Sequence, residues 1–132
     1  MKIELAKTEV IHFVGIGGIG MSGLALIMKG LGFKVQGSDQ TTNKNIERLK
    51  KNKIKVYIGH NKKYIQNSTI LVISSAIKQS NSEILMAKKK QLPVYRRGVM
   101  IAHVVYLLKR NIVVAGYHGK TTTTSLVCGI FV

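Results

Sequence analysis

The sequence lacks the features that mark exported or membrane-spanning proteins. It contains a single cysteine, Cys128, which excludes an internal disulfide and fits a reducing compartment. We expect this cysteine to behave as a small, buried apolar residue. No apolar run reaches the roughly 18 residues that a membrane-spanning helix needs, and the opening MKIELAKTEV carries charges where a signal peptide is apolar. These absences predict a cytoplasmic protein without a membrane-inserted segment.

Acidic residues are also scarce. The chain has 5 Asp and Glu against 21 Lys and Arg, for a formal net charge of +16. A field of this sign attracts phosphate-rich partners. However, 17 of the basic residues are lysines scattered along the chain, and only four are arginines, whose planar forks read bases and phosphates better. We therefore expect the lysines to cover exposed faces and predict no nucleic-acid partner.

Apolar strand-like runs alternate with helical patterns through the 132 residues. The strand-like runs cover residues 10–14, 34–37, 56–58, 69–73, 94–95 and 112–115, and the helical patterns cover 21–31, 46–49, 83–90 and 99–108. Such alternation is typical of a parallel sheet with flanking helices. The sequence therefore predicts an α/β fold with a Rossmann-like sheet, whose ligands bind at the carboxyl ends of the strands.

A polar break at residues 109–111 suggests a domain boundary. We expect residues 1–108 to form one α/β domain, and residues 109–132 to begin a second one with a strand at 112–115 and a phosphate-loop helix. A strand and half a helix bury too little surface to stand as a domain. We therefore expect the chain to be a truncated product, a fragment, or one piece of a split protein.

The first candidate site is the glycine loop that follows the first strand. GIGGIG at Gly15–Gly20 satisfies the pattern G-x-G-x-x-G, precedes a helix, and is followed by Asp39 after the next strand. Backbone N–H groups in such a loop approach a diphosphate at a helix N-terminus. A glycine turn chosen only for packing the helix on the strand is the alternative. For Asp39, the alternatives are a ribose contact or a helix-capping turn.

The second candidate site is GYHGKTTTT, where a predicted strand meets a predicted helix. It contains G-x-x-G-K-T at Gly116–Thr121, with two residues fewer between its glycines than the Walker pattern requires. Lys120 could still reach phosphates, and the hydroxyl of Thr121 could bind a magnesium ion. His118 is expected to shape the phosphate loop rather than act as a base. A threonine-rich helix cap is the alternative interpretation.

The other histidines do not form a metal site with the single cysteine. We expect His12, in the middle of a strand, to be a core residue. His60, in a GHNK turn, is expected to be exposed. His103 falls on a helix without an acidic or cysteine partner nearby in the sequence.

Six motifs in order resemble those of the Mur ligase family of peptidoglycan synthesis, over nearly the whole chain. They are IHFVGIGGIGMSGLA (11–25), GSD (37–39), IGH (58–60), VISSAIK (72–78), PVYRRGVM (93–100) and VAGYHGKTTTTSLV (114–127). The set is far more specific than either loop alone. The resemblance departs at Gly98, at His103 and at Tyr117, which stands where the family usually has threonine.

The resemblance implies that residues 1–108 bind a UDP-sugar, UDP-N-acetylmuramate. The residues implied to bind it are Gly15, Gly17, Gly18, Ile19, Gly20, Asp39, Ser74, Ser75, Ala76 and Arg97. It also implies an ATP site at Gly116, Tyr117, His118, Gly119, Lys120, Thr121 and Thr122, with Lys120 and Thr121 as catalytic residues and Thr121 on Mg²⁺. In the implied reaction ATP phosphorylates the muramyl carboxylate, and the amine of L-alanine attacks the acyl phosphate.

Two other functions remain open at this point. A stand-alone dinucleotide-binding module of the NAD type would need only the glycine loop and Asp39. A non-catalytic UDP-sugar-binding remnant is the other, because the chain by itself is expected not to catalyse the ligation. The partner of such a remnant would be the rest of the ligase.

Overall fold

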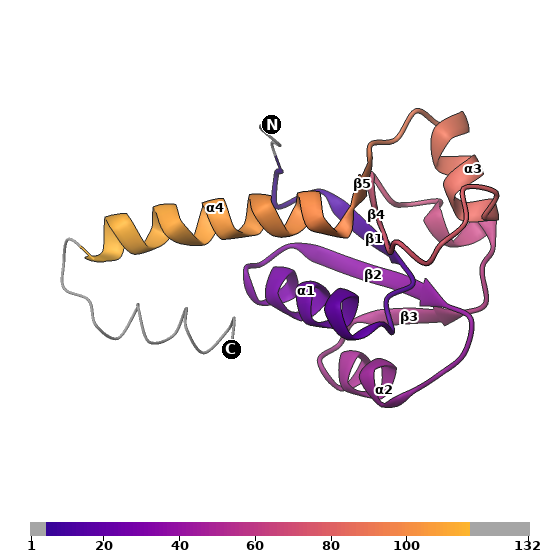
Figure 1. Ribbon diagram of the computed structural model, residues 1–132, viewed down its shortest axis with the longest axis horizontal. Helices are drawn as coiled ribbons and strands as arrows, with labels where there is room; N and C mark the ends of the chain where they lie inside the picture. Colours follow the sequence, from indigo (N-terminus) through magenta and orange to yellow (C-terminus); the bar gives the residue numbers. More distant parts are fainter. Residues whose placement is uncertain (1–4, 117–132) are drawn as a thin grey trace.

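The computed structural model describes residues 5–116, and they form one parallel sheet covered by helices on both faces (Figure 1). The strands are β1 (Val10–Val14), β2 (Lys34–Asp39), β3 (Lys55–Ile58), β4 (Ile70–Ile73) and β5 (Val94–Arg96). Their order across the sheet is β3-β2-β1-β4-β5, and every neighbouring pair is parallel. The predicted α/β class and parallel sheet are confirmed.

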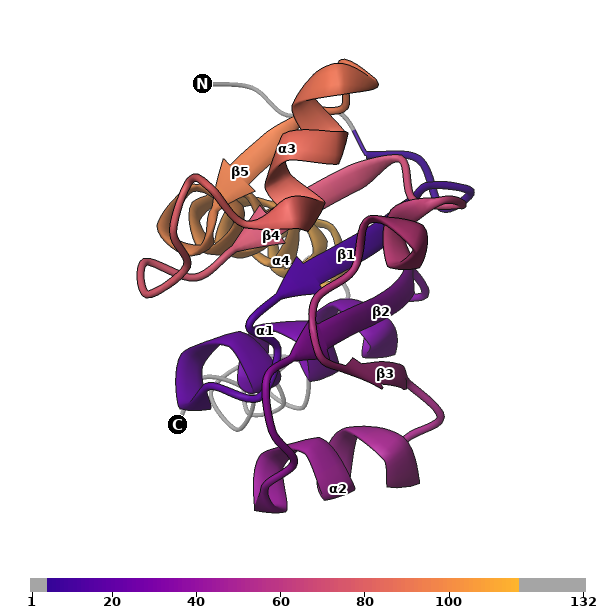
Figure 2. The same cartoon turned by 90° about the vertical axis from the view of Figure 1, so that its right-hand side faces the viewer.

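The helices are α1 (Ile19–Gly30), α2 (Lys44–Lys51), α3 (Ser82–Lys89) and α4 (Arg97–Gly116), with a 3₁₀ turn, η1 (Lys62–Ile65). Helices α1, α2 and α4 pack on one face, around a core that includes Phe13 and Met28. Helix α3 and η1 cover the other face, around Leu71 and Ile84 (Figure 2). The central strands β1 and β4 are almost completely buried because helices cover both faces.

The strand order places a switch point between β1 and β4. The chain moves outward from β1 to β2 and β3, then returns to the other side of β1 for β4 and β5. In open parallel sheets, ligands bind in the crevice at the carboxyl ends of the strands beside such a switch. The loops after β1 and β4 therefore flank the expected ligand crevice.

Helix α4 differs from the sequence prediction. The helix predicted at 99–108 is present, but it continues to Gly116, so the strand predicted at 112–115 is wrong for this structure. β-branched residues favour a strand only where a neighbouring strand can pair with their backbone N–H and C=O groups. In a helix, these backbone groups are paired within the helix itself. Helix α4 continues without a break through residue 109, so the helix does not mark the predicted domain boundary. That boundary stays a prediction.

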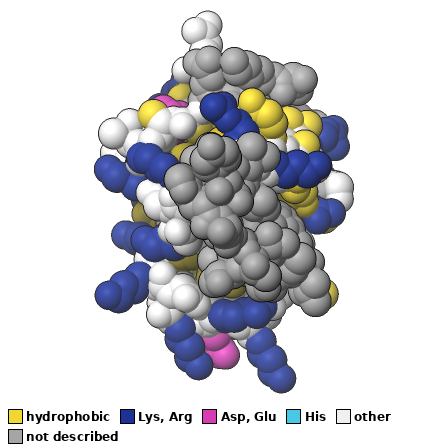
Figure 3. Space-filling view, turned by 90° about the vertical axis from the view of Figure 1, so that its left-hand side faces the viewer, with side chains coloured by type: hydrophobic (Ala, Val, Ile, Leu, Met, Phe, Trp, Pro, Cys, Tyr) yellow, Lys and Arg dark blue, Asp and Glu magenta, His cyan; other side chains and the backbone are white. Residues whose placement is uncertain are grey.

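On the face shown in Figure 3, lysine and arginine side chains lie at several separate places rather than in one patch. None of the helices among residues 5–116 is both long and apolar enough to cross a bilayer.

Candidate ligand site at the glycine loop

The glycine loop is anchored to the end of the neighbouring strand β2. Gly15 has a φ of +86°, a conformation that favours glycine. This turn brings the N–H groups of Gly15 and Ile16 to the carbonyl oxygen of Ser38, at 2.9 and 3.0 Å. The next amide, that of Gly17, donates to Oδ2 of Asp39 at 2.7 Å. The end of β2 therefore sets the path of the loop.

The structure brings the predicted substrate residues together from four strand ends. A Cβ atom added at Gly15 would lie 3.2 Å from Cβ of Ser74, which follows β4. A Cβ at Gly20 would collide with the guanidinium of Arg97, which follows β5. With Asp39 on Gly17, each glycine of the G-x-G-x-x-G pattern faces one of the predicted residues.

Ser75 and Ala76 lie on the exposed loop after β4. The amide of Ala76 donates to Oγ of Ser74 at 3.1 Å, so it closes a local turn. The two residues share the sheet edge of the glycine loop, and their contact with a ligand stays a prediction.

The backbone amides in the first turn of α1 have no hydrogen-bond partner among the described residues. Helices α2 and α3 have Asn43 and Asn81 as N-caps, and the side chain of each accepts a hydrogen bond from an amide of the first turn. Helix α1 has Gly18 as its N-cap, with no side-chain cap and no acidic residue in its first turn. Within residues 5–116, no acceptor faces the amides of Ile19, Gly20 and Met21. Ile19 and Gly20 are exposed, so their amides are open to an anion, whereas Met21 is buried.

The loop residues therefore divide into two groups. The amides of Gly15 and Gly17 donate to groups at the end of β2 and hold the turn, while those of Ile19 and Gly20 form no hydrogen bond among the described residues. The carboxylate of Asp39 is likewise engaged, with Oδ1 accepting from the amide of Gln40 at 2.7 Å. A turn-stabilising role for Asp39 is visible in the structure, and its ribose contact stays a prediction.

The side chain of Arg97 lies beside Gly20, in the first turn of α1, and brings a positive charge there. It is exposed and follows β5 directly as the first residue of α4. Its guanidinium forms no ion pair with the acidic groups of the described segment. A free guanidinium beside uncapped amides is suited to a phosphate, whose oxygens accept charge-assisted hydrogen bonds.

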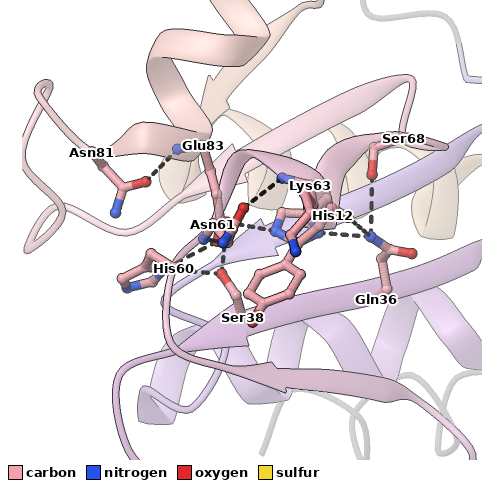
Figure 4. Close-up of polar contacts among 10 residues, drawn as sticks. His12, Gln36, Ser38, His60, Asn61, Lys63, Ser68, Asn81 and Glu83 are labelled. Atoms are coloured by element: carbon pink, nitrogen blue, oxygen red, sulfur yellow. Dashed lines mark hydrogen bonds and ion pairs between the residues drawn. The ribbon is translucent and has the colours of Figure 1, made fainter.

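A buried polar cluster lies beneath the same strand ends, on the face covered by α3. We call it the Glu83 cluster; it consists of His12, Ser38, His60, Asn61 and Glu83 (Figure 4). His12 is a core residue, as predicted, with no exposed surface. The prediction that His60 is exposed is wrong, because Nδ1 lies 3.1 Å from Oγ of Ser38 and only 12% of the side chain is exposed. Sequence reasoning missed Glu83, although it is one of only five acidic residues.

His103 lies half-buried on α4, and Nε2 is buried without a partner within residues 5–116. Burial lowers the pKa of His103, because the charged imidazolium loses hydration. Replacing it with leucine is expected to leave stability unchanged or raise it. The advantage should grow as pH falls below 6.5, the ordinary pKa, since only the unfolded chain then gains the proton freely. Urea unfolding of His103→Leu at pH 7.5 and 5.5 measures this, and a loss of stability at both pH values would contradict it.

The second candidate loop lies at the edge of the described structure. Gly116 is the last residue of α4, and the rest of the predicted ATP site, Tyr117, His118, Gly119, Lys120, Thr121 and Thr122, lies outside the described residues. Among residues 5–116, no three histidine, cysteine or acidic side chains group in a way that could hold a metal ion.

A family model described as "Mur ligase family, catalytic domain" matches residues 10–118. The chain is 71% identical over 131 residues to the UDP-N-acetylmuramate–L-alanine ligase of Pelagibacter ubique, and the match covers 99% of this chain and 28% of that protein. It is 51% identical to the ligase of the same name from Bartonella bacilliformis, covering 98% and 27%. The chain thus spans about 28% of the length of the curated relatives it matches.

Solved structures agree with these matches. A UDP-N-acetylmuramate–alanine ligase from Thermotoga maritima superposes with a TM-score of 0.73 at 30% identity, over 76% of this chain and 23% of that one. A ligase from Neisseria meningitidis, named for joining UDP-N-acetylmuramate to a tripeptide, superposes with a TM-score of 0.64 at 29% identity. The match covers 67% of this chain and 28% of that structure.

Proposed function

This chain belongs to the Mur ligase family, and we propose that it forms the UDP-N-acetylmuramate-binding part of a ligase that joins L-alanine to that sugar's carboxylate. The observation that carries the proposal is the 71% identity, across 131 residues, to a ligase named for these two substrates. In the proposed reaction ATP activates the carboxylate as an acyl phosphate, which the amine of L-alanine attacks. Protein groups contribute to such a step mainly by positioning and by neutralising charge.

We propose that the diphosphate of the UDP-sugar binds at the first turn of α1. The uncapped amides of Ile19 and Gly20 supply hydrogen bonds, and the positive end of the helix dipole favours an anion. Arg97 beside Gly20 adds a full positive charge. The high net charge of +16 favours the approach of an anionic ligand from solution.

The uridine end is proposed to lie near Asp39, and the loop from Ser74 to Ala76 to line the other side. Asp39 is partly exposed at the end of β2, so its carboxylate can accept a further hydrogen bond while it holds Gly17. ATP and Mg²⁺ enter the proposal through the sequence of Gly116–Thr122 alone. There Lys120 would contact phosphates and Thr121 the magnesium ion.

Calorimetric titration of the full chain tests the proposal. UDP-N-acetylmuramate, NADH and Mg·ATP are titrated separately, and saturable binding of the UDP-sugar is expected. Binding of NADH without binding of the UDP-sugar would support the dinucleotide module instead. Saturable binding of the UDP-sugar but not of Mg·ATP would favour a chain with only the UDP-sugar-binding role.

Arg97→Ala is expected to weaken binding of UDP-N-acetylmuramate by about tenfold, because a charge-assisted hydrogen bond to a phosphate is lost. The unfolding midpoint in urea should not change, since the side chain is exposed. Arg96→Ala is the matched control: it removes the same charge from the neighbouring exposed residue on β5. Equal weakening by both variants would indicate a general charge effect and contradict a specific role for Arg97.

A further inference from the structure

The carboxylate of Glu83 connects three segments that end at the ligand edge of the sheet. Its side chain is fully buried in the first turn of α3. Oε1 accepts from Nε2 of His12 on β1 and from Oγ of Ser38 on β2, both at 2.7 Å. Oε2 accepts from the amide of Asn61 at 3.0 Å and faces Nδ1 of His60 at 3.3 Å. Figure 4 shows how His12, Ser38, His60 and Asn61 converge on Glu83 from different elements.

Hydrogen-bond geometry assigns the protons in this cluster. The side-chain amide nitrogen of Gln36 donates to the backbone carbonyl of Tyr64 at 2.9 Å, which orients the amide. The same nitrogen lies 2.8 Å from Nδ1 of His12, so Nδ1 is the acceptor and Nε2 carries the proton given to Glu83. The ring of His12 is therefore held in this orientation by Gln36, with Nε2–H directed at Glu83.

Glu83 is ionised in this setting. Burial raises the pKa of its carboxyl group, but hydrogen bonds from His12, Ser38 and the amide of Asn61 outweigh burial, and the pKa lies below its ordinary value. The charge of this buried carboxylate is compensated by its hydrogen-bond donors, so losing one of them is costly.

Ser38 links this carboxylate to the glycine loop. Its side chain donates to Glu83, while its own carbonyl oxygen accepts from the amides of Gly15 and Ile16. The next residue, Asp39, accepts from the amide of Gly17, and its carbonyl accepts from Gly59, beside His60. Ser38 therefore contacts Glu83 through its side chain and holds the glycine loop through its backbone carbonyl.

We propose that Glu83 is a positioning residue for the glycine loop: by fixing Ser38 and the 60–61 turn, it sets the path of Gly15–Gly17 and thereby the direction of the open amides that follow. Glu83 does not touch the ligand in this role. The part of the inference that concerns ligand affinity rests on the proposed function. The part that concerns the loop geometry does not.

The experiment uses the full chain with Glu83→Gln, which keeps the volume but turns an amide donor toward groups that donate. We expect the amide resonances of Gly15, Ile16 and Gly17 to shift in ¹H–¹⁵N spectra, and the Nε2–H tautomer of His12 to be lost. UDP-N-acetylmuramate should bind about tenfold more weakly at a temperature where both proteins are fully folded. Glu47→Gln is the matched control, since Glu47 lies in the first turn of α2 and is exposed.

A second variant keeps the test decisive if Glu83→Gln does not fold. Ser38→Ala removes only the hydroxyl that joins the carboxylate to the loop anchor, and the backbone carbonyl remains. The same loop resonances should shift, with weaker binding of the UDP-sugar. Unchanged loop resonances and unchanged affinity in the folded variants would overturn the inference, because a purely stabilising role moves neither.

The two proposals fail in distinguishable ways. If the unmodified chain does not bind UDP-N-acetylmuramate, the proposed function is wrong, and the loop resonances alone decide the role of Glu83. If the unmodified chain binds and the loop resonances of both variants match those of Glu47→Gln, the positioning role is wrong and the proposed function stands.

Discussion

Replacing Gly37 with alanine is expected to destabilise the fold by about 3 kcal/mol, by overpacking the core. A Cβ atom at this position would lie 2.5 Å from Cδ1 and 2.7 Å from Cβ of Ile16, and 2.7 Å from the carbonyl oxygen of Phe13. That carbonyl cannot move aside, since Phe13 pairs with Gly37 on one side and with Val72 on the other. The methyl group must therefore displace Ile16 or separate two central strands.

Gly23→Ala is the matched control for Gly37→Ala. Gly23 lies inside α1, and a Cβ atom there would meet nothing within 4 Å. Alanine is the better helix former, so this variant should gain up to about 1 kcal/mol. Urea unfolding of both variants measures the difference. If the two changed stability in the same direction, close packing at Gly37 would not be the cause.

The absence of a side chain at Gly37 also helps to fix the glycine loop at the ligand edge of the sheet. Ile16 belongs to the glycine loop, and its side chain fills the space above Gly37 with no exposed surface. The loop is thus packed into the core by Ile16 as well as hydrogen-bonded to Ser38. We expect Gly37→Ala to disturb the loop together with the fold.

Much of the fold was predictable from local sequence. The central strands are apolar apart from His12, and each is followed by glycine or polar residues, so β1 and β4 were found within a residue or two. The meeting of the loops after β1, β2 and β4 at one edge followed from the rule for parallel strands, whereas Ser74 and Arg97 were assigned to this site by the family resemblance alone.

The features that were missed depend on contacts between distant residues. Glu83 lies 71 positions from His12 in the sequence, and neither residue alone signals a buried pair. His60 looked like an exposed turn residue because its partners, Ser38 and Glu83, come from other elements. The β-branched residues at 112–114 predicted a strand, but the structure continues α4 through them. Strand propensity depends on context, whereas a helix needs no partner segment for its hydrogen bonds.

His12→Leu is expected to lower the free energy of unfolding by about 2–3 kcal/mol at pH 7, because a hydrogen bond to a buried charge is lost. Leucine fills a similar volume, so the cavity contribution is small. Gln36 keeps Tyr64 and Ser68 as acceptors, which leaves Glu83 as the group that loses its partner. His103→Leu is the matched control, since its Nε2 has no partner among the described residues.

The pH dependence of the stability loss in His12→Leu tests whether the charge of Glu83 causes that loss. The pKa of Glu83 is lowered by its hydrogen bonds in the folded chain, so its stabilisation is present above 4.5, the ordinary value. It is lost as pH falls through the lowered pKa, and the difference between the unmodified chain and His12→Leu should narrow there. In a Glu83→Gln background the same substitution should cost far less. An equal cost in both backgrounds would mean that His12 stabilises the core by packing alone, and that no buried carboxylate holds the strand ends together.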